Sequence, residues 1–147
     1  MTRSYPVFLL AFGALGLLLP SSSFAGDEPS TLNVVEFKMQ ASSNKGVVRC
    51  GLFARAGWLK KPLRTATATP SAGSALCVFD KVPAGTLGIS AFHDENSNGK
   101  LDTNFVGMPV EDYCASRDAR GTFGPPSFDD AKFDYRGGTK RLSARLK

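Results

Sequence analysis

The sequence predicts an all-β domain, an immunoglobulin-like or prealbumin-like two-sheet sandwich of about seven strands with a long loop after its central hairpin. Two observations lead to this prediction. Short segments in which apolar and polar residues alternate recur along the chain, and Gly, Pro, Ser and Asn separate them, which is typical of half-buried strands joined by turns. About seven such segments fit within roughly 100 residues, the strand density of a sandwich.

The predicted strands begin after residue 30 and continue to the C-terminus. The first changes phase at Val34 and Val35, which indicates a bulge or a change of sheet. The most regular is 86–93, in which period two places His93 on the same face as three apolar residues. In chain order the strands are 31–39, 46–54, 65–69 (an edge strand), 75–79, 86–93, 131–135 and 141–147.

The first 25 of the 147 residues are expected to be an export signal, separate from the fold. Arg3 supplies a positive start, residues 7–19 are apolar, and Ala25 is the small residue needed at a cleavage site. The apolar run of 13 residues is too short to span a bilayer, which takes about 20. We therefore expect residues 26–147 to form a single periplasmic or secreted domain without a transmembrane segment.

Charge and histidine content exclude several classes of function. The chain has 18 Lys and Arg against 13 Asp and Glu, a formal net charge of +5. This excess is small and scattered, so a nucleic-acid partner is not expected. The basic cluster at residues 140–147 is interpreted as the solvated side of the last strand. His93 is the single histidine, which excludes zinc sites that need two or three histidines from one chain.

Three cysteines remain in the exported part of the chain. Cys50 and Cys77 lie in strand-like segments, whereas Cys114 lies in an irregular one. We predict a Cys50–Cys77 disulfide, because an oxidising compartment favours pairing between neighbouring strands. Such a bond would contribute about 3 kcal/mol. The alternative is two buried free thiols. Cys114 is then either free or paired with another chain.

A second pattern occupies the loop directly after the most regular strand. Oxygen-bearing side chains alternate there, as in the first part of a calcium loop, with a glycine at position 6 for the sharp turn. The predicted ligands are Asp94, Asn96, Asn98, the carbonyl of Lys100, and Asp102. Position 12 is Phe105 and the flanks are strand-like, so the segment is not an EF-hand. The missing carboxylate is assigned to Glu111, with Asp112 as the alternative.

Calcium at this loop is expected to bind weakly, with a dissociation constant of about 0.1 to 1 mM, because the loop offers few formal charges. The competing interpretation is a hairpin with an Asn-Gly turn, stabilised by its own Asx side chains and free of metal. The segment 94–130 has almost no alternation. A stretch of this length inside a small domain needs something to organise it.

Three ordered motifs resemble one bacterial family. They are the segment 91–104, which contains His-Asp-Glu-Asn-Ser-Asn-Gly-Lys-Leu-Asp-Thr-Asn, the segment 107–111, and Gly-Pro-Pro-Ser-Phe-Asp-Asp-Ala-Lys-Phe at 124–133. Together with the lead-in at 79–85, they are similar to the bacterial domain-of-unknown-function family 2141. The resemblance implies a small exported β-sandwich and implies no particular activity.

An enzyme is disfavoured by the available side chains. Ser90 and His93 lie three residues apart on a strand and point to opposite faces, and no Gly-x-Ser-x-Gly elbow occurs. The leading hypothesis is therefore a non-enzymatic module whose calcium-ordered loop presents a surface for an unknown protein or carbohydrate of the cell envelope. The alternatives are a metal-free envelope domain that contacts anionic surface polymers through its basic end and, least favoured, a hydrolase using His93.

Overall fold

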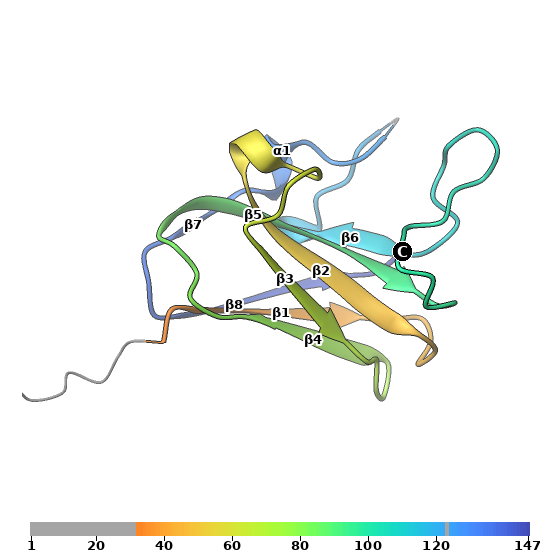
Figure 1. Ribbon diagram of the computed structural model, residues 1–147, viewed down its shortest axis with the longest axis horizontal. Helices are drawn as coiled ribbons and strands as arrows, with labels where there is room; N and C mark the ends of the chain where they lie inside the picture. Colours follow the sequence, from red (N-terminus) through yellow and green to blue (C-terminus); the bar gives the residue numbers. More distant parts are fainter. Residues whose placement is uncertain (1–31, 123) are drawn as a thin grey trace, which may run out of the picture.

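The first predicted strand lies at the centre of the smaller of two sheets. The computed structural model describes residues 32–122 and 124–147, and these form a two-sheet sandwich (Figure 1). In the smaller sheet the order is β4 (Ser74–Phe79), β1 (Val34–Gln40) and β8 (Thr139–Arg145). Strand β1 is antiparallel to β4 and parallel to β8. The predicted sandwich is confirmed.

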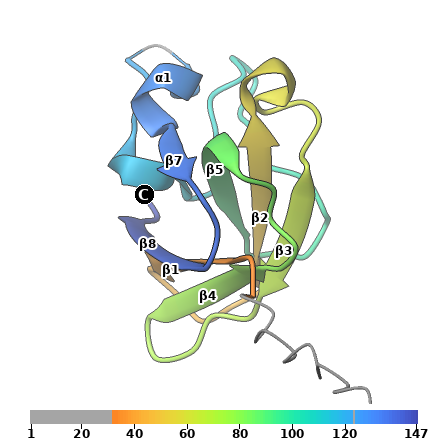
Figure 2. The ribbon, with the colours of Figure 1, turned by 90° about the vertical axis from the view of Figure 1, so that its left-hand side faces the viewer.

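The larger sheet is antiparallel and contains five strands. Its order is β3 (Arg64–Ala68), β2 (Val47–Ala54), β5 (Gly85–Asp94) and β6 (Tyr113–Ala115), and β7 (Phe133–Tyr135) pairs with the beginning of β5. Figure 2 shows the smaller sheet as one layer and the larger sheet as the other. The described residues thus form eight strands rather than the predicted seven or so.

The core fills the space between the two layers. Alternation along each strand sends one set of side chains inward, and burial of each large aliphatic or aromatic side chain stabilises the fold by about 1.5 to 3 kcal/mol. Leu52 and Ile89 face inward as direct neighbours on β2 and β5. The other large apolar side chains of the core are Val35, Phe37, Met39, Val48, Phe79, Val82, Leu87, Phe133, Tyr135 and Leu146.

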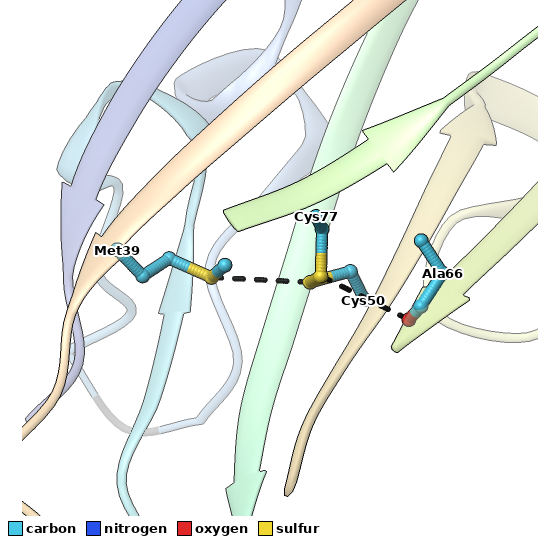
Figure 3. The surroundings of a disulfide bond; sticks show 4 residues. All are labelled: Met39, Cys50, Ala66 and Cys77. Atoms are coloured by element: carbon cyan, nitrogen blue, oxygen red, sulfur yellow. Dashed lines mark hydrogen bonds between the residues drawn. A yellow bond between two sulfur atoms is a disulfide. The ribbon is translucent and has the colours of Figure 1, made fainter. Parts of the chain in front are cut away.

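A disulfide joins the two sheets through this core. Cys50 of β2 is bonded to Cys77 of β4, as the sequence predicted (Figure 3). The Cys50 Sγ lies 3.9 Å from the Met39 Sδ, and the Cys77 Sγ lies 3.9 Å from the Ala66 carbonyl oxygen. A disulfide sulfur carries no hydrogen, so both contacts are packing contacts rather than hydrogen bonds. The bond therefore holds β2 against β4 within the buried core.

The segment 94–130, predicted to be irregular, contains regular elements. It includes β6, the 3₁₀ turn η2 (Ser116–Asp118) and most of the short helix α1 (Phe128–Ala131). Elements of three residues are too short to show an alternating pattern in the sequence. The position of β6 is set instead by its pairing with β5. Ser116 ties them together: its Oγ accepts the Ile89 N–H at 2.9 Å and donates to the Ala131 carbonyl at 2.5 Å.

The C-terminal strand agrees with its predicted pattern. Ala144 and Leu146 are buried, while Arg141, Ser143 and Arg145 are exposed on the outer face of the smaller sheet. The predicted export signal, residues 1–25, lies outside the described residues, as do residues 26–31. Among the residues that the structure describes, no helix is long and apolar enough to cross a membrane.

Candidate functional site

A groove of about 900 Å³ lies on the outer face of the five-stranded sheet. Its floor comes from the backbone of Gly51 on β2 and from side chains that point away from the core, including Ser90 and Phe92 of β5 and Thr65 and Thr67 of β3. Segments 101–109 and 124–126 form its sides. Apolar and aromatic groups dominate this lining, and a few hydroxyls supply polar contacts, which is the usual composition of a ligand site.

Two glycines let aromatic rings lie directly on the outer face of the sheet. A Cβ at Gly51 would meet the Phe53 ring at 2.6 Å, and one at Gly88 would meet the Trp58 ring at 2.8 Å. Phe53, Trp58 and Phe128 form a row of edge-to-face contacts with ring centroids 5.4 and 5.5 Å apart. The glycines therefore set the depth at which these rings pack. The row continues from the Phe53 side of the groove over β5.

Hydrogen bonds hold the segment 124–126 in place. The Trp58 Nε1–H donates to the Pro126 carbonyl at 2.9 Å. Arg55, from the 3₁₀ turn η1 (Arg55–Gly57), donates twice to the Asp129 carboxylate of α1, at 2.6 and 2.8 Å. The hydrogen bonds from Arg55 and then Lys132 lower the pKa of the Asp129 carboxyl well below its usual range. This side of the groove is thus tied to the sheet from two directions.

The opposite side of the groove is the loop that joins β5 to β6, seen in Figure 1 extending beyond the end of the sheet. Within it the Asn104 Oδ1 accepts the N–H groups of Val106 and Met108 at 3.1 and 3.0 Å, and Thr103 pairs with Pro109. These bonds form a tight turn. Its apolar side chains are exposed at the tip: Phe105 (99%), Val106 (64%), Met108 (52%) and Val110 (64%).

The buried carboxylate of Asp94 anchors the base of this loop. Its Oδ1 accepts the Asn98 N–H at 2.9 Å, and its Oδ2 accepts the Gly99 N–H at 2.9 Å and the Arg49 Nε–H at 2.6 Å. Burial alone would raise the pKa of Asp94, but the hydrogen bonds from Arg49, Gly99 and Asn98 outweigh it and lower that pKa below its ordinary value. Arg49 also lines the groove, so the anchor and the groove share a residue.

The other predicted calcium ligands gather beside this anchor. The Asp102 carboxylate accepts the side-chain amides of Asn96 at 2.6 Å and of Asn98 at 2.8 and 2.9 Å, and these bonds lower the pKa of Asp102. Glu111 returns as predicted and accepts the Glu95 and Asp102 N–H groups at 3.1 and 3.0 Å. The Lys100 N–H donates to Asn98 Oδ1 at 3.0 Å. The loop therefore brings the side chains of Asn96, Asn98, Asp102 and Glu111 into one hydrogen-bonded network beside Asp94.

This arrangement does not fit a calcium shell without rearrangement. Each carboxylate oxygen of Asp94, Asp102 and Glu111 already accepts an N–H group, and Arg49 holds a positive charge against Asp94. Calcium requires six to eight oxygen ligands, so the Asn96 and Asn98 amides would have to turn their oxygens inward. Within the described ranges, no three His, Cys, Asp or Glu side chains form a metal-ligand group. In the structure, hydrogen bonds and the Arg49–Asp94 ion pair connect the residues of this loop.

His93 lies on the core face of β5, as predicted, and its side chain is fully buried. Its Nε2 is 2.7 Å from the Lys45 carbonyl, which requires Nε2 to carry the proton. The Nδ1 has no hydrogen-bond partner among the described residues, and Glu95 Oε1 is 3.8 Å away. Ser90 faces the opposite side of the sheet. The histidine thus connects β5 to the β1–β2 turn.

Cys114 is free and lies in the core between the sheets. Burial raises the pKa of its thiol to about 12, so the reactive thiolate is not formed near neutral pH. Pairing with another chain would require this buried side chain to move to the surface.

Sequence reasoning missed most of the groove. Tyr113 lines the groove, whereas Trp58 and Phe128 pack on Gly88. The signal that could have indicated the floor is the composition of the outward-facing positions of β2 and β5, where Gly51 lies opposite Ser90 and Phe53 lies opposite Gly88. Of these four residues Ser90 alone is polar, whereas the outer face of a sheet exposed to solvent carries mostly polar residues.

The fold and groove define a class, a small β-sandwich module with a rigid, apolar-tipped loop beside one sheet. The chain belongs to a family described as "Uncharacterized protein conserved in bacteria (DUF2141)", which it matches over residues 39–143. This match covers β2 to β7 and parts of the two strands on either side. Searches of curated protein sequences and of solved structures find no match.

Proposed function

We propose that this protein is an exported, non-enzymatic binding module that holds a protein or carbohydrate of the cell envelope in the groove on its five-stranded sheet. The observation that carries the proposal is the groove itself, about 900 Å³ with sides fixed by Asp94 and by Trp58. A preorganised site binds with a smaller entropy cost than a flexible one. The Cys50–Cys77 disulfide supports export, because such bonds persist in oxidising compartments.

The chemistry of the lining suits either ligand class. Aromatic faces of Phe92 and Tyr113 can pack against sugar rings or apolar side chains. Arg49 and the hydroxyls of Thr65 and Thr67 offer hydrogen bonds to sugar hydroxyls or peptide carbonyls. The burial of His93, the single histidine, supports a binding role over hydrolysis, since its ring does not reach the groove.

The exposed loop tip provides the test of the groove. We expect V106S/M108S to weaken binding about tenfold or more, because these side chains line the groove and supply its apolar contact area. The matched control is L76S/V78S. Both of its residues are 49% exposed on β4, away from the groove. The control should retain affinity within about twofold.

A glycan array and a displayed peptide library serve as the first probes, and the strongest hits are titrated against the wild type and both double variants. Thermal melts of all three proteins check that the substitutions leave the fold intact. A ligand that binds V106S/M108S as tightly as it binds the wild type contradicts a site at the groove. So does a ligand whose binding is lost equally in V106S/M108S and in the control L76S/V78S.

Calcium binding by the loop of residues 94–111 remains a prediction, and a calcium titration tests it. At about 10 to 100 times the dissociation constant, a ligand of the folded state stabilises it by about 1.4 to 2.7 kcal/mol. The expected result is a melting temperature that rises with millimolar calcium, falls again on chelation, and does not respond in D102N. If calcium changes neither the melting temperature nor the amide exchange of Asn98 and Gly99, the prediction of calcium binding is wrong.

A further inference from the structure

A second pocket, of about 630 Å³, lies where the end of β8 meets the turn η2. Its lining includes four basic side chains that come from three separate parts of the chain: Lys38 of β1, Arg120 after η2, and Arg145 and Lys147 at the end of β8. Asp118 is the one carboxylate side chain in this lining. The fold therefore gathers positive charge that is dispersed along the sequence.

These four cations are not neutralised by neighbouring carboxylates. None of them has an Asp or Glu oxygen within 4.0 Å among the residues that the structure describes. Arg141, on the same strand as Arg145, is by contrast paired with a carboxylate, because its Nε donates to Glu36 Oε2 at 2.7 Å. Asp118 uses its Oδ1 to accept the backbone N–H of Arg145 at 2.8 Å. The pocket keeps an excess of positive charge.

Two of the guanidinium groups are held in fixed positions. Arg120 donates to the carbonyls of Tyr113 at 2.9 Å and of Arg145 at 2.7 Å. Arg145 donates through Nε to the Gln40 Oε1 at 2.8 Å, and its two terminal nitrogens have no hydrogen-bond partner within residues 32–122 and 124–147. A preoriented guanidinium loses less rotamer entropy when it binds an oxyanion, and its planar fork matches two oxygens at once.

We propose that this pocket binds a ligand that carries several neighbouring phosphate groups. The pocket is much larger than a single phosphate ion, and four cations around it can neutralise more than one charge. Lys38 and Lys147 supply mobile ammonium groups, while Arg145 supplies the oriented fork. The site is separate from the groove and does not depend on the function proposed for it. The two adjoin at Arg120, whose guanidinium carbon is 5.6 Å from the centre of the Tyr113 ring.

Tripolyphosphate is the probe for this pocket. We expect the wild-type protein to bind it with an affinity that falls as salt rises, since each contact releases counterions. Charge reversal in K38E/K147E should weaken binding about tenfold or more and reduce the salt dependence. The matched control is K60E/K61E, which changes net charge equally at exposed lysines after η1, outside this pocket. It should keep the affinity within about twofold.

Additional probes identify the source of the phosphates, and additional variants serve as controls. Binding to vesicles of phosphatidylcholine, with and without phosphatidylglycerol, is compared with binding to tripolyphosphate. If K38E/K147E weakens binding to the vesicles that contain phosphatidylglycerol, the phosphates belong to lipid headgroups. If K38E/K147E weakens binding to tripolyphosphate alone, the ligand is a free or polymeric phosphate. K38Q/K147Q repeats the test without reversed charge. V106S/M108S should bind tripolyphosphate normally, which separates this site from the groove. The proposal is overturned if neither probe binds, or if K60E/K61E loses as much affinity as K38E/K147E.

Discussion

Removing the disulfide with C50A/C77A lowers the free energy of unfolding by about 3 to 4 kcal/mol. The bond connects residues 27 apart in sequence and restricts the unfolded chain accordingly. It also joins β2 to β4, which lie in different sheets, so its loss frees the two layers to separate. Urea unfolding followed by fluorescence of the single Trp58 measures the effect.

Cys114 provides the control for this experiment. In C114A the disulfide is intact, so strong reductant in the unfolding buffer should still lower the stability by about the same amount. In C50A/C77A the same reductant should have no further effect. Equal stability of the wild type and C50A/C77A would show that the bond does not contribute to the fold as we describe.

The second large effect is expected from D94N, which lowers the melting temperature by about 10 °C. Asp94 accepts three N–H groups, and an amide in its place turns one acceptor oxygen into a further donor. Arg49 also loses its counter-charge. We expect the amide protons of Asn98 and Gly99 to exchange faster with solvent, because the base of the loop opens.

The pH dependence of this variant follows from the lowered pKa of Asp94. Because that pKa is lower in the folded than in the unfolded state, its stabilisation is present above about pH 4 and is lost as the pH falls through the folded value. The difference in melting temperature between wild type and D94N is therefore constant near neutral pH and narrows in acid. A difference that grows in acid contradicts this assignment.

The same change at Asp102 is the matched control for D94N. Asp102 is half-buried, and its carboxylate accepts side-chain amides rather than backbone N–H groups. These amides can turn or bond to water, so D102N should lower the melting temperature much less than D94N. Equal losses would place the anchor of the loop elsewhere than the Arg49–Asp94 pair.

The strands and the disulfide could be predicted because their signals are local. Period two along β5 placed Leu87, Ile89 and His93 on one face, and strand-like surroundings identified Cys50 and Cys77 as partners. The family resemblance is confirmed over residues 39–143. Convergence of Asp94, Asn98 and Asp102 was also predictable, because these residues are close in sequence and separated by a glycine turn.

Features that depend on distant residues could not be predicted. Arg49 is 45 residues from Asp94, and nothing in either segment indicates that the guanidinium faces that carboxylate. The strand β6 is three residues long and exists because β5 offers an edge. The basic pocket combines Lys38 with Arg145, whereas the sequence suggested a basic end alone. Each of these follows from strand order, which alternation does not specify.

The parallel pairing of β1 with β8 constrains how the chain can be made. Glu36 and Arg141 are neighbours although they are 105 positions apart. During synthesis, which proceeds from the N-terminus, β1 has one edge without its β8 partner until residues 139–145 have been made. Contacts of such long sequence separation also make folding slow. The smaller sheet is therefore completed after the pairing of strands that lie closer in sequence.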